Sequence, residues 1–102
     1  MTDKLVSGVM EPSCVGWYNF VSETVWYNGT WYISKDVAGR WGIASEDASF
    51  MTFGLDILDY WYDDLDEGQN ATYYPHGIYE GNAVVKKAPN PPPDRTMRGM
   101  GA

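Results

Sequence analysis

Apolar and polar residues follow different patterns in different parts of the chain, and each pattern predicts its own kind of element. Aromatic and β-branched residues, the usual content of β-strands, crowd four stretches: residues 14–20, 24–34, 71–79 and 81–87. In the second stretch, the pair Asn28-Gly29 stands between apolar residues, and this pair favours a type I′ turn because both positions need positive φ. We therefore expect a small antiparallel sheet of about four strands, with a hairpin at Asn28-Gly29.

Residues 45 to about 67 follow a helical period instead. Ser45 can act as the N-cap, and Glu46 and Asp47 suit the positive end of a helix dipole. At about 100° per residue, the apolar side chains gather on one side of the helix: Phe50, Met51, Gly54, Leu55, Ile57, Leu58, Trp61, Tyr62 and Leu65. The acids gather on the other side: Asp56, Asp59, Asp63, Asp64, Asp66 and Glu67. The pattern predicts one amphipathic helix with an acidic outer face.

The two ends of the chain lack such periodicity. Residues 1–13 contain Gly8 and Pro12 and read as an irregular N-terminal arm, whereas the prolines that follow Ala88 favour a polyproline II conformation. We therefore predict an α+β fold, with the helix packed across the sheet in one small domain. Its expected bounds are 1–13 for the N-terminal arm, 14–87 for the domain and 88–102 for a Pro-rich basic C-terminal arm.

Length and composition narrow the classes of protein that fit. A chain of 102 residues with 44% hydrophobic content suits one small globular domain. It holds no apolar run of about 18 residues and no readable secretory signal, so we expect neither a membrane span nor export. Cys14 is the only cysteine, which excludes an internal disulfide framework and a cysteine-rich zinc site.

Charge is spread unevenly along the chain, whose net charge is −7. Residues 41–85 carry nine acids and no Lys or Arg, whereas residues 86–102 carry Lys86, Lys87, Arg95 and Arg98 against Asp94. An acidic body repels nucleic acid, because binding phosphates requires Lys and Arg. The basic tail, in contrast, can dock onto an acidic protein surface, including that of a neighbouring copy.

Residues with catalytic chemistry are few. His76 is the only histidine, and nothing in the sequence pairs it with Cys14 as a nucleophile and base. The acidic run 63–68 fails the spacing of a calcium-binding EF-hand loop. No nucleophile elbow or phosphate-binding glycine loop is present either. We therefore expect no catalytic residue, no metal site and no cofactor.

Two short segments resemble known families. Residues 25–35, VWYNGTWYISK, look like the aromatic hairpin of small chitin-binding modules, which implies that Trp31 and Tyr32 could stack on a sugar. Residues 95–102, RTMRGMGA, resemble the Arg-Gly-x-Gly-Ala endings of small proteins of tailed bacteriophages. The second resemblance implies a structural component of a virion.

Three hypotheses for function follow. The first is a non-enzymatic structural subunit of a tailed-phage particle, a capsid cement or decoration protein or a small tail or neck component. It would bind other virion proteins or copies of itself, through Lys86, Lys87, Pro91, Pro92, Arg95, Arg98, Trp31 and Tyr32. The second is an acidic DNA mimic in the host cytoplasm that inhibits a nucleic-acid-binding protein through the six acids of the predicted helix. The third is a sugar-binding module.

Overall fold

The computed structural model describes residues 3–8, 12–63 and 70–89, and within them the chain forms a closed barrel of eight β-strands. The strands are β1 (Lys4–Ser7), β2 (Gly16–Ser22), β3 (Val25–Tyr27), β4 (Tyr32–Lys35), β5 (Trp41–Ala44), β6 (Tyr60–Asp63), β7 (Thr72–His76) and β8 (Ala83–Lys87). Two short 3₁₀ helices, η1 (Pro12–Cys14) and η2 (Ala48–Phe50), interrupt the connections.

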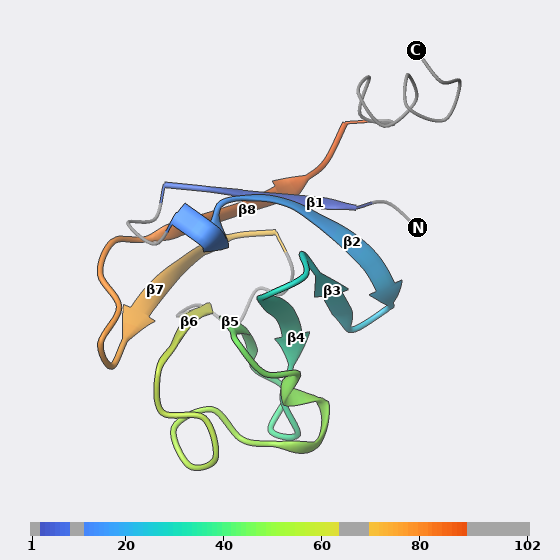
Figure 1. Ribbon diagram of the computed structural model, residues 1–102. Helices are drawn as coiled ribbons and strands as arrows, with labels where there is room; N and C mark the ends of the chain where they lie inside the picture. The colour runs from blue at the N-terminus through green and yellow to red at the C-terminus, as the bar shows by residue number, and fades with distance from the viewer. Residues whose placement is uncertain (1–2, 9–11, 64–69, 90–102) are drawn as a thin grey trace.

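Every strand pairs antiparallel with its neighbours in sequence, and the ring closes where β1 pairs with β8 (Figure 1). In this closing pair Leu5 lies opposite Lys86 and Val6 opposite Val85. On the other side of β1, the Asp3 carboxylate ties the start of this strand to β2: it accepts hydrogen bonds from the Trp17 indole (2.7 Å) and the Phe20 amide (2.9 Å). An up-and-down barrel of this kind leaves no strand edge unpaired.

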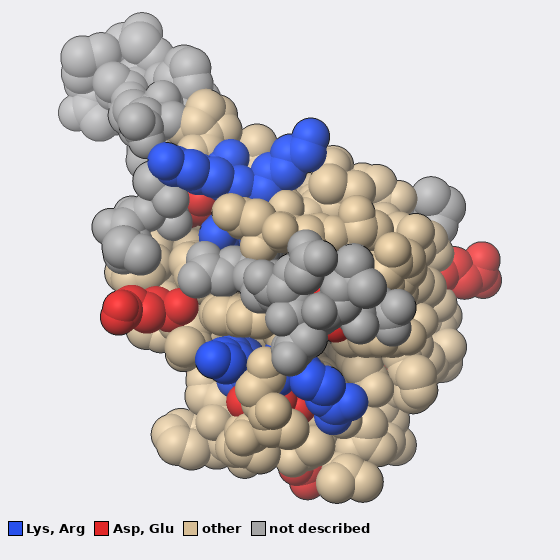
Figure 2. Space-filling model, turned by 180° about the vertical axis from the view of Figure 1, so that it is seen from behind, with Lys and Arg blue, Asp and Glu red and all other residues tan. Residues whose placement is uncertain are grey.

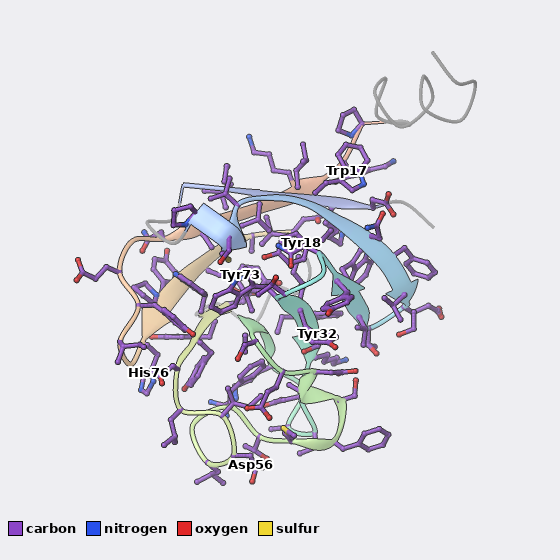
Figure 3. The ribbon with its side chains drawn as sticks, viewed as in Figure 1. Trp17, Tyr18, Tyr32, Asp56, Tyr73 and His76 are labelled. Atoms are coloured by element: carbon purple, nitrogen blue, oxygen red, sulfur yellow. The ribbon has the colours of Figure 1, made fainter. Side chains whose placement is uncertain are left out.

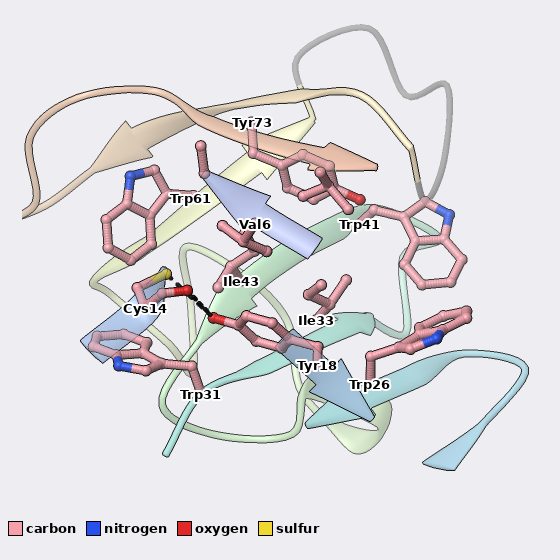
Figure 4. Close-up of a cluster of buried hydrophobic side chains, with 12 residues drawn as sticks. Val6, Cys14, Tyr18, Trp26, Trp31, Ile33, Trp41, Ile43, Trp61 and Tyr73 are labelled. Atoms are coloured by element: carbon pink, nitrogen blue, oxygen red, sulfur yellow. Dashed lines mark hydrogen bonds between the residues drawn. The ribbon is translucent and has the colours of Figure 1, made fainter. Parts of the chain in front are cut away.

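Side chains fill the interior of the barrel (Figure 4). Large aromatic residues dominate, and each removes about 150–250 Å² of surface from water. The Tyr18 hydroxyl also donates a hydrogen bond to the carbonyl oxygen of Cys14 at 2.6 Å, so this polar atom is satisfied inside the core. The cluster comprises Val6, Cys14, Tyr18, Trp26, Trp31, Ile33, Trp41, Ile43, Trp61, Tyr73, Ala83 and Val85.

The predicted α+β fold is wrong, because the structure is an all-β barrel with twice the expected number of strands. The predicted helix over residues 45–67 is absent from the described part of that range, 45–63. Its first half is a long connection that contains only the short η2, and its second half contains β6.

Local residues explain why residues 45–63 do not form a helix. Gly54 has φ of +94°, which breaks a helical path, and the Asp56 carboxylate accepts a hydrogen bond from the Thr52 amide at 2.8 Å to close a turn. Further on, three consecutive aromatics favour a strand. Trp61 points into the barrel, and its neighbours Tyr60 and Tyr62 point outward. The apolar residues that fit one helical period therefore lie on two different sides of the barrel wall, its interior and its outer surface.

The hairpin predicted at Asn28-Gly29 is confirmed, with a different turn. Tyr27 pairs with Tyr32, so the loop has four residues, 28–31, instead of the two of a type I′ turn. The Asn28 side chain holds this loop by accepting hydrogen bonds from the amides of Thr30 (2.9 Å) and Trp31 (2.6 Å). The predicted N-terminal arm, residues 1–13, contains a strand, β1, and β5 is a further strand outside the four predicted stretches.

Candidate docking surface

The long connection between β5 and β6, residues 45–59, folds back over the outer side of β4, β5 and β6, and we call it the covering loop. In Figure 1 it is the green to yellow-green segment at the bottom, on the opposite side of the barrel from β1 and β8. It creates a second apolar cluster outside the barrel, made of Ala44, Ala48, Phe53, Ile57 and Tyr60.

Small residues on the barrel wall let the covering loop approach closely. A methyl group on Gly42 would lie 2.6 Å from the ring of Phe53 and 2.8 Å from the Trp61 carbonyl oxygen, so only glycine fits beneath this ring. Next to it, the buried Ser34 hydroxyl accepts a hydrogen bond from the Ala48 amide at 3.0 Å. These positions on β4 and β5 therefore fix the loop to the wall.

Asp36 is the second attachment point. One carboxylate oxygen accepts hydrogen bonds from the amides of Ala38 (3.0 Å) and Arg40 (2.8 Å), and the other accepts one from the Phe53 amide (3.0 Å). Arg40 lies 3.5 Å from the same carboxylate and also donates to the Phe53 carbonyl oxygen. The buried charge is thus fully partnered, and it joins the β4–β5 turn to the covering loop.

The covering loop also presents large apolar side chains to solvent. Phe50 is 94% exposed, Leu55 78% and Leu58 61%, although Phe53 and Ile57 of the same loop are buried. Ile78, in the turn between β7 and β8, is 77% exposed and is joined to the loop by its amide, which donates to the Asp59 carboxylate at 2.9 Å. We call Phe50, Leu55, Leu58 and Ile78 the docking face.

Outward-facing aromatic residues lie on both flanks of the covering loop. On β3 and β4, the rings of Tyr27 and Tyr32 stack with centroids 4.3 Å apart. On β6 and β7, the His76 ring stacks on Tyr60 at 4.7 Å and meets the edge of Tyr62 at 6.5 Å. Desolvation and the neighbouring Tyr27 hydroxyl raise the pKa of Tyr32.

Acidic side chains accompany the docking face. Glu46, Asp47 and Asp56 are exposed on the covering loop, and Glu80 is exposed in the neighbouring β7–β8 turn. Residues 45–59 contain no Lys or Arg. Figure 3 shows Asp56 at the end of the covering loop, far from Trp17 on the opposite side of the barrel. The surface is therefore apolar, and acidic side chains surround it except at Arg40, which reaches the covering loop from the β4–β5 turn and pairs with Asp36.

Basic side chains lie in two places. Lys86 and Lys87 are exposed at the end of β8, and Figure 2 shows one group of basic side chains at the top of the molecule, where β1 and β8 lie, and a second group in its lower half. Lys4 differs from them, because it is buried. Its ammonium donates to the Asn70 side chain at 2.7 Å and lies 4.6 Å from the centre of the Trp26 ring. Burial, together with Lys87, lowers the pKa of Lys4.

The structure separates the binding residues that the sequence singled out. Trp31 is buried in the barrel core against Trp61, with ring centroids 5.6 Å apart, so it cannot stack on a sugar, whereas Tyr32 faces outward. Lys86 and Lys87 are exposed on β8, on the other side of the barrel from Tyr32. Pro91, Pro92, Arg95 and Arg98 lie outside the described residues.

Of the six acids predicted to share one helix face, the three that the structure describes do not lie on a helix. Asp56 and Asp59 accept hydrogen bonds within the covering loop and from the β7–β8 turn, and Asp63 is buried at the end of β6. Asp64, Asp66 and Glu67 lie outside the described residues. The DNA-mimic hypothesis depended on one acidic face of the predicted helix, so the argument for it fails with that helix.

The remaining candidate groups are dispersed. Cys14 is buried beneath Tyr18, and His76 lies on the outer side of β7 with Nδ1 3.1 Å from the Leu58 carbonyl oxygen. Within residues 3–8, 12–63 and 70–89, no group of three or more His, Cys, Asp or Glu could hold a metal ion. In the same part of the chain, no helix has the length and apolar character needed to cross a membrane.

Sequence reasoning missed the docking face, although it named three of its four residues. Phe50, Leu55 and Leu58 were placed with Ile57 on one apolar side of a helix, which would have buried all four. The available signal was the excess of apolar residues around Gly54, in a segment too rich in them for one buried stripe. Comparison of the chain with protein-family models, curated proteins and solved structures returned no match.

Proposed function

We propose that this protein is a non-enzymatic structural subunit of a tailed-phage particle, a capsid cement or decoration protein or a small tail or neck component, that docks on neighbouring subunits through the docking face. The observation that carries this proposal is the exposure of Phe50, Leu55, Leu58 and Ile78, which are 61–94% accessible on one side of the barrel. Large exposed apolar side chains on one side of a molecule offer a partner protein area to bury. Residues 95–102 resemble the C-terminal endings of small proteins of tailed bacteriophages, and this resemblance points to a phage particle as the assembly.

The surroundings of the docking face indicate the partner's chemistry. Four acidic side chains lie around it, two tyrosines flank it on one side, and no Lys or Arg occurs in residues 45–59. Such a surface complements an apolar patch that carries Arg or Lys, because an apolar centre gives affinity and complementary charge gives orientation.

Incorporation into particles tests this function. Replacing Phe50, Leu55 and Leu58 together by Ser should reduce the copies per purified particle by about tenfold or more, since truncated anchor residues dominate the loss of binding energy. Quantitative mass spectrometry of particles purified from the producing cells measures the copy number. Because all three side chains are exposed, stability should change by less than about 0.5 kcal/mol per site.

The matched control replaces two exposed valines outside the docking face, Val15 and Val21, by Ser. This control should enter particles at the wild-type copy number, and circular dichroism should show both variants folded. The proposal is overturned if the wild-type chain is absent from particles, or if the triple variant enters them as efficiently as the wild type.

A further inference from the structure

The negative charge around the docking face limits which protein surfaces can bind it. The covering loop carries Glu46, Asp47, Asp56 and Asp59 without a basic residue, and Glu80 lies in the turn that contacts it. Two docking faces placed against each other would bring these acids together, and like charges at an interface oppose association. A symmetric face-to-face dimer is therefore disfavoured, and the occupant must bring positive charge.

The complementary chemistry is present in the same chain. Residues 86–102 carry four basic residues against one acid, together with three consecutive prolines and two methionines. Proline-rich segments dock on surfaces lined with aromatic rings, and methionine adapts to irregular apolar surfaces. The docking face offers Phe50 and the flanking Tyr27 and Tyr32 for such contacts, and the surrounding carboxylates suit Arg95 and Arg98.

β8 and the covering loop lie on opposite sides of the barrel, an arrangement that suits a contact between two copies. The Ala88 amide donates to the Asp3 carbonyl oxygen at 2.9 Å, so the chain leaves the barrel beside β1. The covering loop lies on the opposite side, over β4, β5 and β6 (Figure 1). A segment that leaves one side of a molecule and binds the other side of the next makes a head-to-tail contact, which repeats from copy to copy.

We infer that the basic C-terminal segment, residues 86–102, of one copy binds the acidic docking face of the next copy, which joins copies of this chain head to tail. This inference rests on the proposed function, because it names the neighbouring subunit as a second copy. The contact combines exposed charges with apolar anchors, so the affinity falls as salt screens the charges.

A charge-swap experiment on the full chain tests the contact. The first variant carries Glu46→Arg and Glu80→Arg, two exposed positions that take no part in the described hydrogen bonds of the covering loop. The second carries Arg95→Glu and Arg98→Glu. Sedimentation velocity should show that the wild type self-associates and that each variant alone dissociates at least about tenfold more readily, because like charges then meet.

Mixing the two variants should restore association. In the mixture, the basic face of the first variant meets the acidic segment of the second, and the remaining pair keeps the wild-type charges. A variant that had merely lost its fold would not recover on mixing. Raising NaCl from 50 to 500 mM should weaken the wild-type contact by about tenfold or more.

A monomeric wild type, or a mixture that stays dissociated, overturns the inference. A segment that bound its own docking face would give the first of these results. The proposed function fails separately, through the copy number in particles. A chain that is monomeric in solution and yet enters particles through Phe50, Leu55 and Leu58 would keep the proposed function and remove the head-to-tail contact.

Discussion

The barrel interior and the cluster beneath the covering loop differ in how many elements build them. The interior receives side chains from all eight strands, including Val6 at one end of the chain and Val85 at the other. The outer cluster joins one loop to one side of the wall, through Phe53, Ile57 and the ends of β5 and β6. The interior therefore couples the whole ring, whereas the outer cluster can open without unfolding it.

The two clusters also differ in what lies on their far side. Every large residue of the interior is enclosed by the barrel, but the covering loop is a single layer with one buried side and one exposed side. Few contacts hold the covering loop in place: its hydrogen bonds to Asp36 and Ser34, and its close packing on Gly42. Its free side chains can therefore serve binding without weakening the fold.

The largest effect should come from the interior. Trp61 is fully buried and contacts Trp31 and Tyr79, with the ring stacked on Tyr79 at 4.3 Å. Trp61→Ala should lower the free energy of unfolding by about 3–5 kcal/mol, because it removes a large aromatic side chain and leaves a cavity. Urea denaturation measures the loss, and hydrogen exchange should rise in strands all round the ring. A rise confined to β6 would contradict the coupling of the interior.

Alkaline pH should weaken the interior next. Burial raises the pKa values of Tyr18 and Tyr73 far above the ordinary value of about 10. The stability that these neutral tyrosines contribute is complete below pH 10 and is lost as the pH rises, because only the unfolded chain ionises them. The expected loss is about 1.4 kcal/mol per tyrosine and pH unit above 10.

Denaturant titrations between pH 8 and 11.5 measure this slope. The double variant with Tyr18→Phe and Tyr73→Phe is the matched comparison, since it cannot ionise at either position. Its stability should fall less steeply above pH 10, even though the lost hydrogen bond from Tyr18 makes it less stable at neutral pH. Equal slopes in the two proteins would refute the assignment to these tyrosines.

The smallest loss of stability should come from a change in the outer cluster. Gly42→Ala places a methyl group against the Phe53 ring and the Trp61 carbonyl oxygen, so the covering loop must move outward. We expect a cost of about 1–3 kcal/mol. Hydrogen–deuterium exchange should rise in residues 45–59 and stay unchanged in β1, β2 and β8. Val21→Ala, at an exposed position of β2, is the control and should leave both regions as they are.

Sequence reasoning located most strands but not their number or arrangement. Alternation and β-branched content identified the regions of β2, β3, β4, β7 and β8. β1 and β5 have four residues each, and β5 contains Gly42 beside Trp41, so neither carries a long alternating pattern. Barrel closure depends on the pairing of β1 with β8, a contact across almost the whole chain that no local pattern records.

The candidate site was harder to predict for a related reason. In residues 45–63 the apolar side chains of the predicted stripe have three different locations: Trp61 fills the barrel, Ile57 fills the outer cluster, and Leu55 faces solvent. Projected onto one helix, these locations merge into a single apolar stripe. The acidity of the same segment was visible from the sequence, and the structure gives it a location around Phe50 and Leu55.

The seam between β1 and β8 limits how copies of this protein can join. Because the ring is closed, the described strands offer no open row of amides and carbonyls onto which another chain could add as an extra strand. The described strands therefore cannot grow by the addition of strands from other copies, which is how amyloid fibrils extend. Contacts between barrels must therefore use side chains, loops or terminal segments, and such contacts can be broken without unfolding the barrel.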